Sequence, residues 1–487
     1  MRASRAMQSS LRSTQSKVAA CAMTALLVLA ACSIDPAVRE AGGAVEIRFD
    51  ASRRYQTIEG WGGGIPSWSE SDPGRLRREV FEKHLPTLLD ALTRDLGLNR
   101  FYSELYATDV EPVNDNEDAF HADMRGFHLN RLEELIRGVI LPLRERVRAR
   151  GDHFVFYIRG FAQRGRFDAR PNVLDENPDE YAELALVVLE KFRGHGISAD
   201  YWVIQNEPEL TVKWEPGRLG IFTARLGKRL RAAGFATRVA GPETLAPDGV
   251  PKWLTAVAQT PGALEVLGVV TYHSYDYDPT RGEPPRLAAR RAVAALARQL
   301  RLPVAQTEQG GGGRANPELW DGSRYEGALD IAESVWADLT AGNVSAWELH
   351  SIFGTRDVQR RWGGGPGTAG SSGAPADDMP SHYVALAHFT RYVRPGAVRV
   401  AAKLVSGAGG VSAAAFLSPA GKPVLVLMQR SSTPRTVRVS GLPAGEYALS
   451  LTTRSKRGEV SALTPVAAGG NLVFELPGES IATIWGQ

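Results

Sequence analysis

Short apolar runs alternate with longer amphipathic segments through most of this chain, and this alternation constrains the fold more than any other feature. Segments with helical periodicity separate the runs. Eight runs of β type lie between Thr57 and Arg394: TIEGWGG, LNRFYSEL, FVFYIRGF, YWVIQNE, TRVAGPE, GVVTYHSY, PVAQTEQ and VSAWELHS. A repeat of strand and helix over such a length predicts parallel βα units.

Several of the separating segments have the length and apolar periodicity of helices. They cover residues 76–95, 129–150, 178–193, 219–233, 287–300 and 325–340. Asn177 followed by Pro178 predicts the start of one of them, because an asparagine cap and a proline in the first turn both favour helix initiation.

Two architectures accommodate eight βα units, a closed (β/α)8 barrel and an open doubly wound sheet. The open sheet usually carries a G-x-G-x-x-G phosphate loop after its first strand, and GWGGG at residues 60–64 lacks that spacing. Polar residues also gather at the C-terminal end of nearly every run, which is where barrel enzymes place their active sites. We therefore expect an α/β fold with a TIM barrel over residues 57–395.

The sequence pattern changes after Pro395. Short alternating runs separated by Gly and Pro, from AVRVAAKLV to SIATIWG, predict an all-β sandwich over residues 396–487. VEIRF at residues 45–49 has the same alternation, so residues 45–56 are expected to add a strand to that sandwich. The Gly- and Ser-rich stretch at 362–378 is expected to form a loop after the eighth barrel strand.

Residues 1–31 have the pattern of an export signal. Basic residues precede an apolar run at residues 18–31, which is too short to span a membrane comfortably. The run ends in Leu-Ala-Ala-Cys and resembles a bacterial lipobox, so Cys32 is expected to be the lipidated start of a tether over residues 32–44. A plain cleaved signal and an uncleaved anchor are the alternatives. The expected location is a bacterial cell envelope, with the protein attached to the membrane by lipid.

Charge and cysteine content exclude several classes of function. The formal net charge is +3, and it falls to −1 (3 − 4 = −1) without the four basic residues of the signal, which leaves no basic excess for nucleic acid. Cys21 and Cys32 are the only cysteines, and Cys21 lies inside the signal. We therefore expect no disulfide in the mature chain, no thiol nucleophile and no cysteine-bound metal.

Two glutamates stand at the ends of expected barrel strands. Glu207 closes the fourth run and Glu308 the seventh, 101 residues apart (308 − 207 = 101). Strand ends in a closed barrel face one cavity, so both carboxyls can meet there. A pair about 5 to 5.5 Å apart suits a retaining glycosidase, in which one carboxyl attacks and the other, kept protonated, is the acid. Alone, a Glu before a proline is more often a turn residue, so the pairing is what favours catalysis.

From Thr57 onward the chain resembles clan A of the retaining glycoside hydrolases, and within it glycoside hydrolase family 30. The resemblance is carried by IEGWGG, IQNEP, the His-Ser-Tyr pattern at 273–275, QTEQ and LAHFTRYVRPGAVRV. The family includes glucosylceramidases, β-1,6-glucanases, β-1,6-galactanases and xylanases. The resemblance implies that Glu207 is the acid/base, that Asn206 binds the sugar 2-hydroxyl and that Glu308 is the nucleophile. It also implies a side β-domain built from both chain ends.

The resemblance extends to residues that would surround the sugar. Arg100, placed at the end of the second strand, would hold the nucleophile ionised, Tyr275 would donate a hydrogen bond to it, and His273 would line the same cavity. A surface charge is the alternative for Arg100, and a satisfied core histidine is the alternative for His273.

Aromatic and acidic residues near other strand ends complete the expected site. Trp347 is expected to form a platform under the sugar, and Trp61 and Trp68 to line the cleft, with buried packing as the alternative for these two. Glu348 is expected to face away from the cavity because it neighbours Trp347. Glu243 is expected to line the cleft or to have a structural role.

The chain departs from the common family pattern after the third strand. It reads YIRGFAQRGRFDARPNV there, where many members have an apolar loop with a tryptophan. Arg159, Arg164 and Arg166 fall in this segment, and they would either contact an acidic sugar or be solvated loop charges. The departure leaves the substrate open.

The expected function is hydrolysis of a β-linked glycan or glycoside by double displacement through a covalent glycosyl-enzyme, without cofactor or metal. The alternatives are a carbohydrate-binding lipoprotein without activity, a glucosylceramidase-type hydrolase of a lipid glycoside, and a metal-dependent hydrolase. The last is disfavoured because the nine histidines are scattered, without the close pair that barrel metallohydrolases use. The expected partner is a β-linked oligo- or polysaccharide, and the protein is expected to be a monomer.

Overall fold

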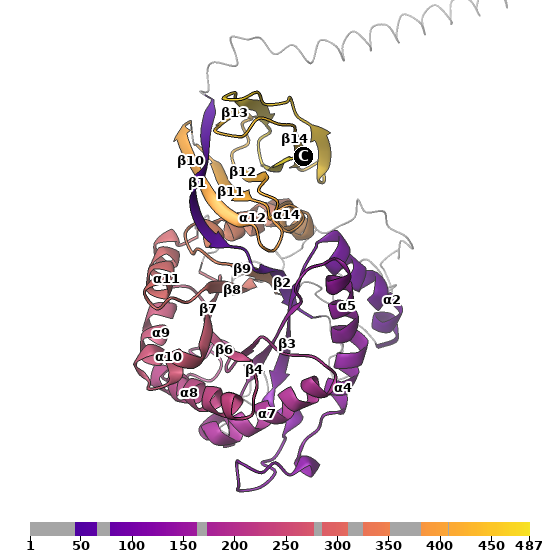
Figure 1. Cartoon of the computed structure of the whole chain (residues 1–487), viewed down its shortest axis with the longest axis vertical. Coiled ribbons are helices and arrows are strands. Elements are labelled where there is room, and N and C mark those ends of the chain that lie inside the picture. Colours follow the sequence, from indigo (N-terminus) through magenta and orange to yellow (C-terminus); the bar gives the residue numbers. More distant parts are fainter. Residues whose placement is uncertain are drawn as a thin grey trace, which may run out of the picture.

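A closed eight-stranded parallel barrel and a nine-stranded mixed sheet make up the computed structural model of this chain (Figure 1). This confirms the expected α/β fold, a TIM barrel with an appended β-domain. The structure describes residues 44–65, 78–162, 173–276, 285–309, 325–350, 381–407 and 409–487. The predictions that lie outside the described residues concern the export signal, Cys32, Trp68, Arg164, Arg166 and the loop at 362–378.

The barrel is formed by strands β2 to β9, which pair in sequence order and close through β9 and β2. Their bounds are β2 (Gly60–Gly64), β3 (Arg100–Tyr106), β4 (Val155–Phe161), β5 (Tyr201–Val203), β6 (Arg238–Thr244), β7 (Leu267–His273), β8 (Val304–Gln309) and β9 (Ala346–Leu349). Because β1 belongs to the other sheet, the first predicted barrel strand is β2 and the eighth is β9.

Helices surround the barrel (Figure 1). The α-helices are α2 (Arg78–Asp90), α3 (Ala107–Val110), α4 (Asn130–Leu135), α5 (Leu141–Ala149), α6 (Val173–Glu176), α7 (Pro178–Gly194), α8 (Pro216–Ala232), α9 (Val250–Gln259), α10 (Ala263–Val266), α11 (Leu287–Gln299), α12 (Tyr325–Thr340) and α14 (Ser381–Thr390). Short helical turns of other types are η1 (Ala91–Asp95), η2 (Met124–Gly126) and η3 (Ile136–Ile140).

Helix α7 begins where the sequence predicts. The Asn177 side chain accepts a hydrogen bond from the backbone N–H of Asp179 at 3.0 Å, and Pro178 occupies the first turn. The cap satisfies a backbone donor that the first turn leaves free, which contributes about 1 kcal/mol. Lys191 and Arg193 in the last turn complement the helix dipole.

Alternation along the barrel strands separates two environments. Outward side chains pack under the helices in one large core, to which Trp61, Trp202 and Trp347 belong. Inward side chains form a small apolar plug that consists of Tyr102, Tyr157, Val203, Ala240, Val269, Ala305 and Ala346. The polar groups of the site lie on the same inner side, beyond this plug toward the strand ends.

The second sheet has the strand order β15-β14-β17-β12-β11-β10-β1-β13-β16. Its strands are β1 (Val45–Thr57), β10 (Val398–Ser406), β11 (Val411–Leu417), β12 (Pro423–Gln429), β13 (Arg435–Ser440), β14 (Tyr447–Thr452), β15 (Glu459–Ala462), β16 (Leu472–Leu476) and β17 (Ser480–Gly486). Residues from strands far apart in this order, such as Val437 and Leu449, share one core, so the sheet curls around its own interior. Strand β1 lies between β10 and β13 and leads directly into β2 (Figure 1).

Helices α12 and α14 join the two parts of the molecule. Phe416, Val426 and Met428 of the second sheet belong to the core beneath the barrel helices, whereas their neighbours Ala415 and Leu427 face the core of the sheet itself. Both faces of β11 and β12 are therefore buried. Among the residues that the structure describes, no helix has both the length and the apolar character to cross a membrane.

Candidate active site

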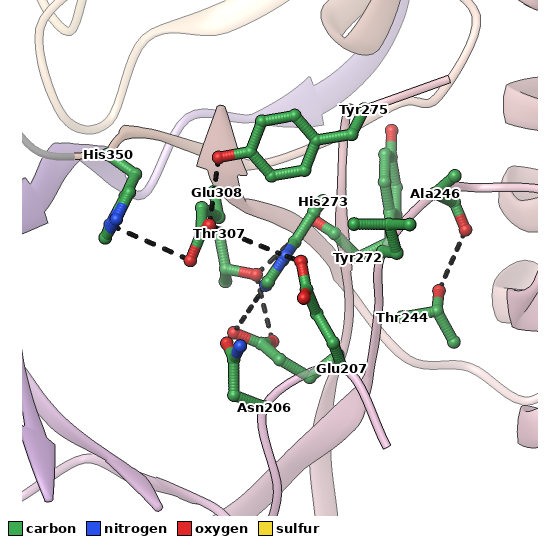
Figure 2. A network of polar contacts seen from close by, with 12 residues as sticks. Asn206, Glu207, Thr244, Ala246, Tyr272, His273, Tyr275, Thr307, Glu308 and His350 are labelled. Atoms are coloured by element: carbon green, nitrogen blue, oxygen red, sulfur yellow. Dashed lines mark hydrogen bonds and ion pairs between the residues drawn. The ribbon is translucent and has the colours of Figure 1, made fainter. Parts of the chain in front are cut away.

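The C-terminal ends of β5, β7 and β8 bring two acids and a histidine together. Glu207 follows β5, His273 ends β7 and Glu308 lies in β8. One oxygen of each carboxyl and one ring nitrogen of His273 lie within 4.8 Å of one another. Figure 2 shows Glu207 and Glu308 on either side of His273. The structure thus brings the two acids predicted from the sequence to one place.

The backbone turns sharply to present Glu207. Its φ is 44°, in the left-handed region, and Glu243 at the end of β6 has a φ of 59°. The N–H of Glu207 donates to the carbonyl oxygen of Glu243 at 3.0 Å, and Thr211 Oγ1 donates to the carbonyl oxygen of Glu207 at 2.9 Å. A bulky residue in this region costs about 1–3 kcal/mol and persists where surrounding contacts hold it. Such strain is typical of functional sites.

Glu308 is held in its ionised form. The Tyr275 hydroxyl donates to Glu308 Oε1 at 2.9 Å, and Arg159 Nη1 donates to Oε2. The Nδ1 atoms of His273 and His350 lie 3.9 Å and 3.8 Å from its oxygens. Burial raises the pKa of Glu308, but the charges of His350, His273 and Arg159 and the Tyr275 hydrogen bond outweigh burial and hold this pKa well below its ordinary value.

His273 bridges two carboxylates. Its Nδ1 lies 3.0 Å from Glu207 Oε1 and its Nε2 lies 3.3 Å from Glu243 Oε1. Burial lowers the pKa of His273, but the neighbouring Glu308, Glu207 and Glu243 raise it more strongly, to about 10. His273 is therefore protonated at neutral pH, and both of its N–H groups face carboxylates.

The side chains of Glu207, His273 and Glu308 are close enough to share a metal ion. A protonated His273 has no lone pair to offer a metal. Arg159 already places a positive charge against Glu308. Both features disfavour a metal cation at this position.

Arg159 is a buried part of this site. It is 0% exposed within β4, its Nε lies 3.1 Å from Glu243 Oε1, and its guanidinium lies 3.7 Å from the ring centroid of Tyr102. Neither expectation for Arg159, sugar contact or a solvated loop charge, is therefore correct. The sequence signal was an arginine inside the apolar run FVFYIRGF, since a buried charge requires a partner.

The prediction that Arg100 holds the nucleophile is wrong. Arg100 begins β3 instead of ending it, so it lies at the opposite end of the barrel. Its Nε donates to Glu348 Oε1 at 2.9 Å, and its Nη1 donates to Glu59. Arg159, and not Arg100, is the arginine that pairs with Glu308.

The predictions for Trp347 and Glu348 are also wrong, and Trp61 takes the alternative of buried packing instead of lining the cleft. Both tryptophans are 0% exposed in the core beneath the helices. Trp61 Nε1 donates to the carbonyl oxygen of Val393 at 2.7 Å, and Trp347 Nε1 donates to Asp338 Oδ2 at 2.9 Å. Glu348 points into the barrel instead, because the buried Arg100 needs an anionic partner. Neither tryptophan can stack on a sugar from this position.

Asn206 and His350 complete the arrangement. Asn206 is 3% exposed beside Glu207, and its Oδ1 has no hydrogen-bond partner among the described residues, so this amide oxygen is available to a ligand hydroxyl. His350 follows β9, and its Nδ1 lies 2.8 Å from the Tyr102 hydroxyl. His350 was not predicted, although its position at the end of the eighth run could have indicated it.

Glu243 has a structural place in the site. It is 0% exposed, and Thr307 Oγ1 donates to its Oε2 at 2.9 Å. Burial raises the pKa of Glu243, but Arg159 and His273 outweigh burial and lower this pKa. Glu243 is thus an ionised carboxylate that balances the buried cations.

Comparison with known proteins connects this geometry to carbohydrate chemistry. Residues 396–484 match the glycosyl hydrolase family 30 beta sandwich domain. A Caenorhabditis elegans protein provisionally named glucosylceramidase 1 is 22% identical over 439 residues, which are 81% of this chain and 78% of that protein.

Solved structures share the whole fold. A family 30 xylanase C catalytic domain from Talaromyces cellulolyticus has a TM-score of 0.64 at 18% identity, and covers 91% of this chain and 100% of its own. A family 30 endoxylanase from Clostridium papyrosolvens has a TM-score of 0.63 at 15% identity with the same coverage. The chain therefore combines the β-sandwich domain of glycosyl hydrolase family 30 with the barrel fold of that family's xylanases, which confirms its resemblance to glycoside hydrolase family 30.

Proposed function

We propose that this protein is a retaining β-glycoside hydrolase in which Glu308 is the nucleophile and Glu207 the acid/base. The observation that supports this most strongly is the pair of buried carboxyls after β5 and in β8, with oxygens within 4.8 Å of each other. Retaining enzymes place these groups about 5 to 5.5 Å apart, whereas inverting enzymes leave roughly 6.5 to 9.5 Å for a water molecule. The short separation favours direct attack on the sugar.

The reaction follows from the two roles. In the first half, a Glu308 oxygen attacks the anomeric carbon while the glycosidic bond breaks and Glu207 gives its proton to the leaving oxygen. In the second half, the Glu207 carboxylate takes a proton from water, and the water oxygen displaces Glu308 from the anomeric carbon. Two inversions at one carbon return the β configuration.

The charges of the buried cluster suit both halves of this reaction. Arg159 and His273 are positive, and Glu243 and Glu308 are negative, so the cluster is neutral when Glu207 carries a proton. After the first half, Glu308 is a neutral ester and Glu207 is a carboxylate, so the cluster is neutral again. No net charge develops in a site shielded from water, where such a charge would be costly.

Asn206 and Tyr275 suit the handling of the sugar. The free Oδ1 of Asn206 can accept a hydrogen bond from the sugar 2-hydroxyl, as the family resemblance implies. Tyr275 holds the orientation of Glu308 through its hydrogen bond to Oε1. The proposed substrate is a β-linked oligo- or polysaccharide. A lipid glycoside is a second candidate, since the Caenorhabditis elegans relative is named for that class of substrate.

Azide rescue of Glu207→Ala tests the proposal. Turnover of β-glycosides with poor leaving groups should fall by roughly 10²- to 10⁴-fold. Dinitrophenyl glycosides should still form the glycosyl-enzyme nearly as before, because dinitrophenolate departs without being protonated. Sodium azide should restore turnover, and proton NMR should show a β-configured glycosyl azide.

The control for this experiment is Glu209→Ala, two residues further along the chain. Glu209 Oε1 accepts from the backbone N–H of Leu245, so its loss should affect all leaving groups alike, without rescue by azide. An α-configured azide product from Glu207→Ala would exclude double displacement. A protein that binds β-linked oligosaccharides and hydrolyses none would instead support the binding-protein alternative.

We also propose that the protein is anchored by lipid at Cys32. The Leu-Ala-Ala-Cys sequence at residues 29–32 supports this. Mass spectrometry of the N-terminal peptide from membranes of a bacterial host should find a diacylated Cys32, and Cys32→Ala should move the protein out of the membrane fraction. An unmodified N-terminus beyond Cys32 would refute the anchor.

A further inference from the structure

A second group of acids lies outside the barrel, between the segment after β3 and the start of α7. Asp115 in that segment and Glu180 and Glu183 on α7 each offer an oxygen within 4.8 Å of one another. Glu111 adds a fourth carboxyl, since its Oε1 accepts from the backbone N–H of Asp115 at 3.2 Å. These four residues are called the acidic centre below. None of them belongs to the catalytic site.

Three of the four acids of the acidic centre are buried and Asp115 is half-buried, yet most of their carboxylate oxygens have no donor. Glu111, Glu180 and Glu183 are 1%, 4% and 3% exposed. Among the described residues, neither carboxylate oxygen of Glu183 has a hydrogen-bond partner, and one oxygen each of Glu111, Asp115 and Glu180 also lacks one. The amide oxygen of Asn114 is in the same condition. Six oxygens are therefore free for a ligand.

The loop fixes the orientation of these groups through their other atoms. Asp115 Oδ2 accepts from Asn116 Nδ2 at 2.8 Å and from the backbone N–H of Asp123. Asn114 Nδ2 donates to the carbonyl oxygen of Asn116. In Asp115 and Glu111, one carboxylate oxygen is engaged by the loop and the other is not. This is an arranged set of acceptors, unlike a solvated acidic patch.

Nearby cations do not neutralise the acidic centre. Arg229 on α8 lowers the pKa of Glu183, but its Nη1 donates to the carbonyl oxygens of Ala119 at 2.9 Å and Asp179 at 3.4 Å. Arg229 thus directs this nitrogen to backbone oxygens and not to the unpartnered oxygens of the acidic centre.

We propose that the acidic centre binds one calcium ion. All of its donors are oxygens, and six to eight oxygen ligands from carboxylates and amides are what Ca²⁺ prefers. The centre contains no nitrogen or sulfur ligand within its described residues, which disfavours zinc. Magnesium usually keeps several waters and takes only one or two carboxylates. A bound ion ties the segment between β3 and α4, which carries Asp115, to Glu180 and Glu183 on α7.

Calorimetry with the full-length protein tests calcium binding directly. After treatment with EDTA and buffer exchange, titration with CaCl2 should show one equivalent bound, with a Kd between about 10⁻⁷ and 10⁻³ M, the range of sensor and extracellular calcium sites. Binding of MgCl2 should be weaker by at least roughly tenfold. A native protein that binds no calcium at millimolar concentration would overturn the proposal.

Glu183→Gln separates a calcium ligand from a merely structural acid. In EDTA this variant should unfold at the same or a higher temperature than the native protein, because one repelling charge is gone. In saturating calcium it should unfold at a lower temperature than the native protein, and its Kd should rise by at least about tenfold. The sign of the effect therefore reverses with calcium.

The matched control is Glu190→Gln on the same helix, where the side chain is 50% exposed and pairs with Arg193. It should leave both the Kd and the calcium-dependent shift unchanged. A Glu183→Gln protein that binds calcium as tightly as the native one, or that loses the same stability with and without calcium, would overturn the proposal.

Discussion

The barrel contains two buried clusters of arginine and carboxylate, one at each end. At the strand starts, Arg100 pairs with Glu59 and Glu348, and the Tyr157 hydroxyl donates to Glu348. Arg100 contacts one oxygen of Glu348 and Tyr157 the other, so both oxygens have donors. Glu348 therefore has no oxygen without a donor in this cluster.

The cluster at the strand ends is incomplete by comparison. Arg159 pairs with Glu308 and Glu243, but here a further acid, Glu207, joins on a left-handed backbone, and Asn206 Oδ1 has no partner among the described residues. Similar charges thus form two different arrangements. At one end both oxygens of Glu348 have donors, and at the other end an acceptor, Asn206 Oδ1, has none among the described residues. The comparison teaches that surplus acceptors and backbone strain, not buried charge itself, distinguish the end at which we propose catalysis.

Neutralising one carboxylate in each cluster should give the largest difference between the two ends, in activity at one and in stability at the other. Glu308→Gln should lower kcat by roughly four orders of magnitude or more, because a neutral amide cannot attack the anomeric carbon. Glu348→Gln should leave kcat per folded molecule nearly unchanged and lower the free energy of unfolding. Initial rates and thermal unfolding of both variants check this, and equal losses of activity would contradict the division.

Replacing each arginine should give the next largest effect. Arg100→Met leaves Glu348 buried without its cation and should cost about 3–5 kcal/mol of unfolding free energy, with an unchanged pH profile of kcat. Arg159→Met removes a charge that lowers the pKa of Glu308, so the acidic limb of the kcat profile should move to higher pH. A pH profile of kcat that shifts in the Arg100 variant and not in the Arg159 variant would contradict this account.

The pH dependence of thermal unfolding should show a smaller effect, which arises from His273 at the C-terminal strand ends. The pKa of His273 is raised to about 10, above its ordinary value of about 6.5. Its stabilising contribution is therefore complete below about pH 6.5 and is lost as the pH rises through about 10. Thermal unfolding measured across this window should show a steeper loss for the native protein than for His273→Gln. Parallel curves would indicate that His273 is neutral in the folded protein.

Much of the fold could be predicted from the sequence, because strand and helix periodicities differ and eight repeats favour a closed barrel. The acids Glu207 and Glu308 could also be placed, since polar residues at strand ends share one cavity. Which face a residue takes within a strand was harder to predict. Alternation puts Trp347 and Glu348 on opposite sides, but the choice between the sides depends on Arg100, 248 residues away.

Irregular strands limited the prediction further. Between β7 and β8 the register shifts, so that Tyr272 pairs with Gln306 and His273 with Glu308. Simple alternation from Ala305 would have turned Glu308 outward. Such shifts arise from pairing with neighbouring strands, which a single segment does not reveal.

Trapping the covalent intermediate tests the central assignment most directly. The native protein should be incubated with dinitrophenyl 2-deoxy-2-fluoro-β-glycosides, matched to whichever sugar it hydrolyses. Fluorine slows both formation and hydrolysis of the glycosyl-enzyme, whereas the good leaving group speeds formation alone, so the intermediate accumulates. Peptide mass mapping should then find one fluorosugar, attached to Glu308. A label on any other residue, or rapid hydrolysis of the parent glycoside by Glu308→Gln, would contradict the account.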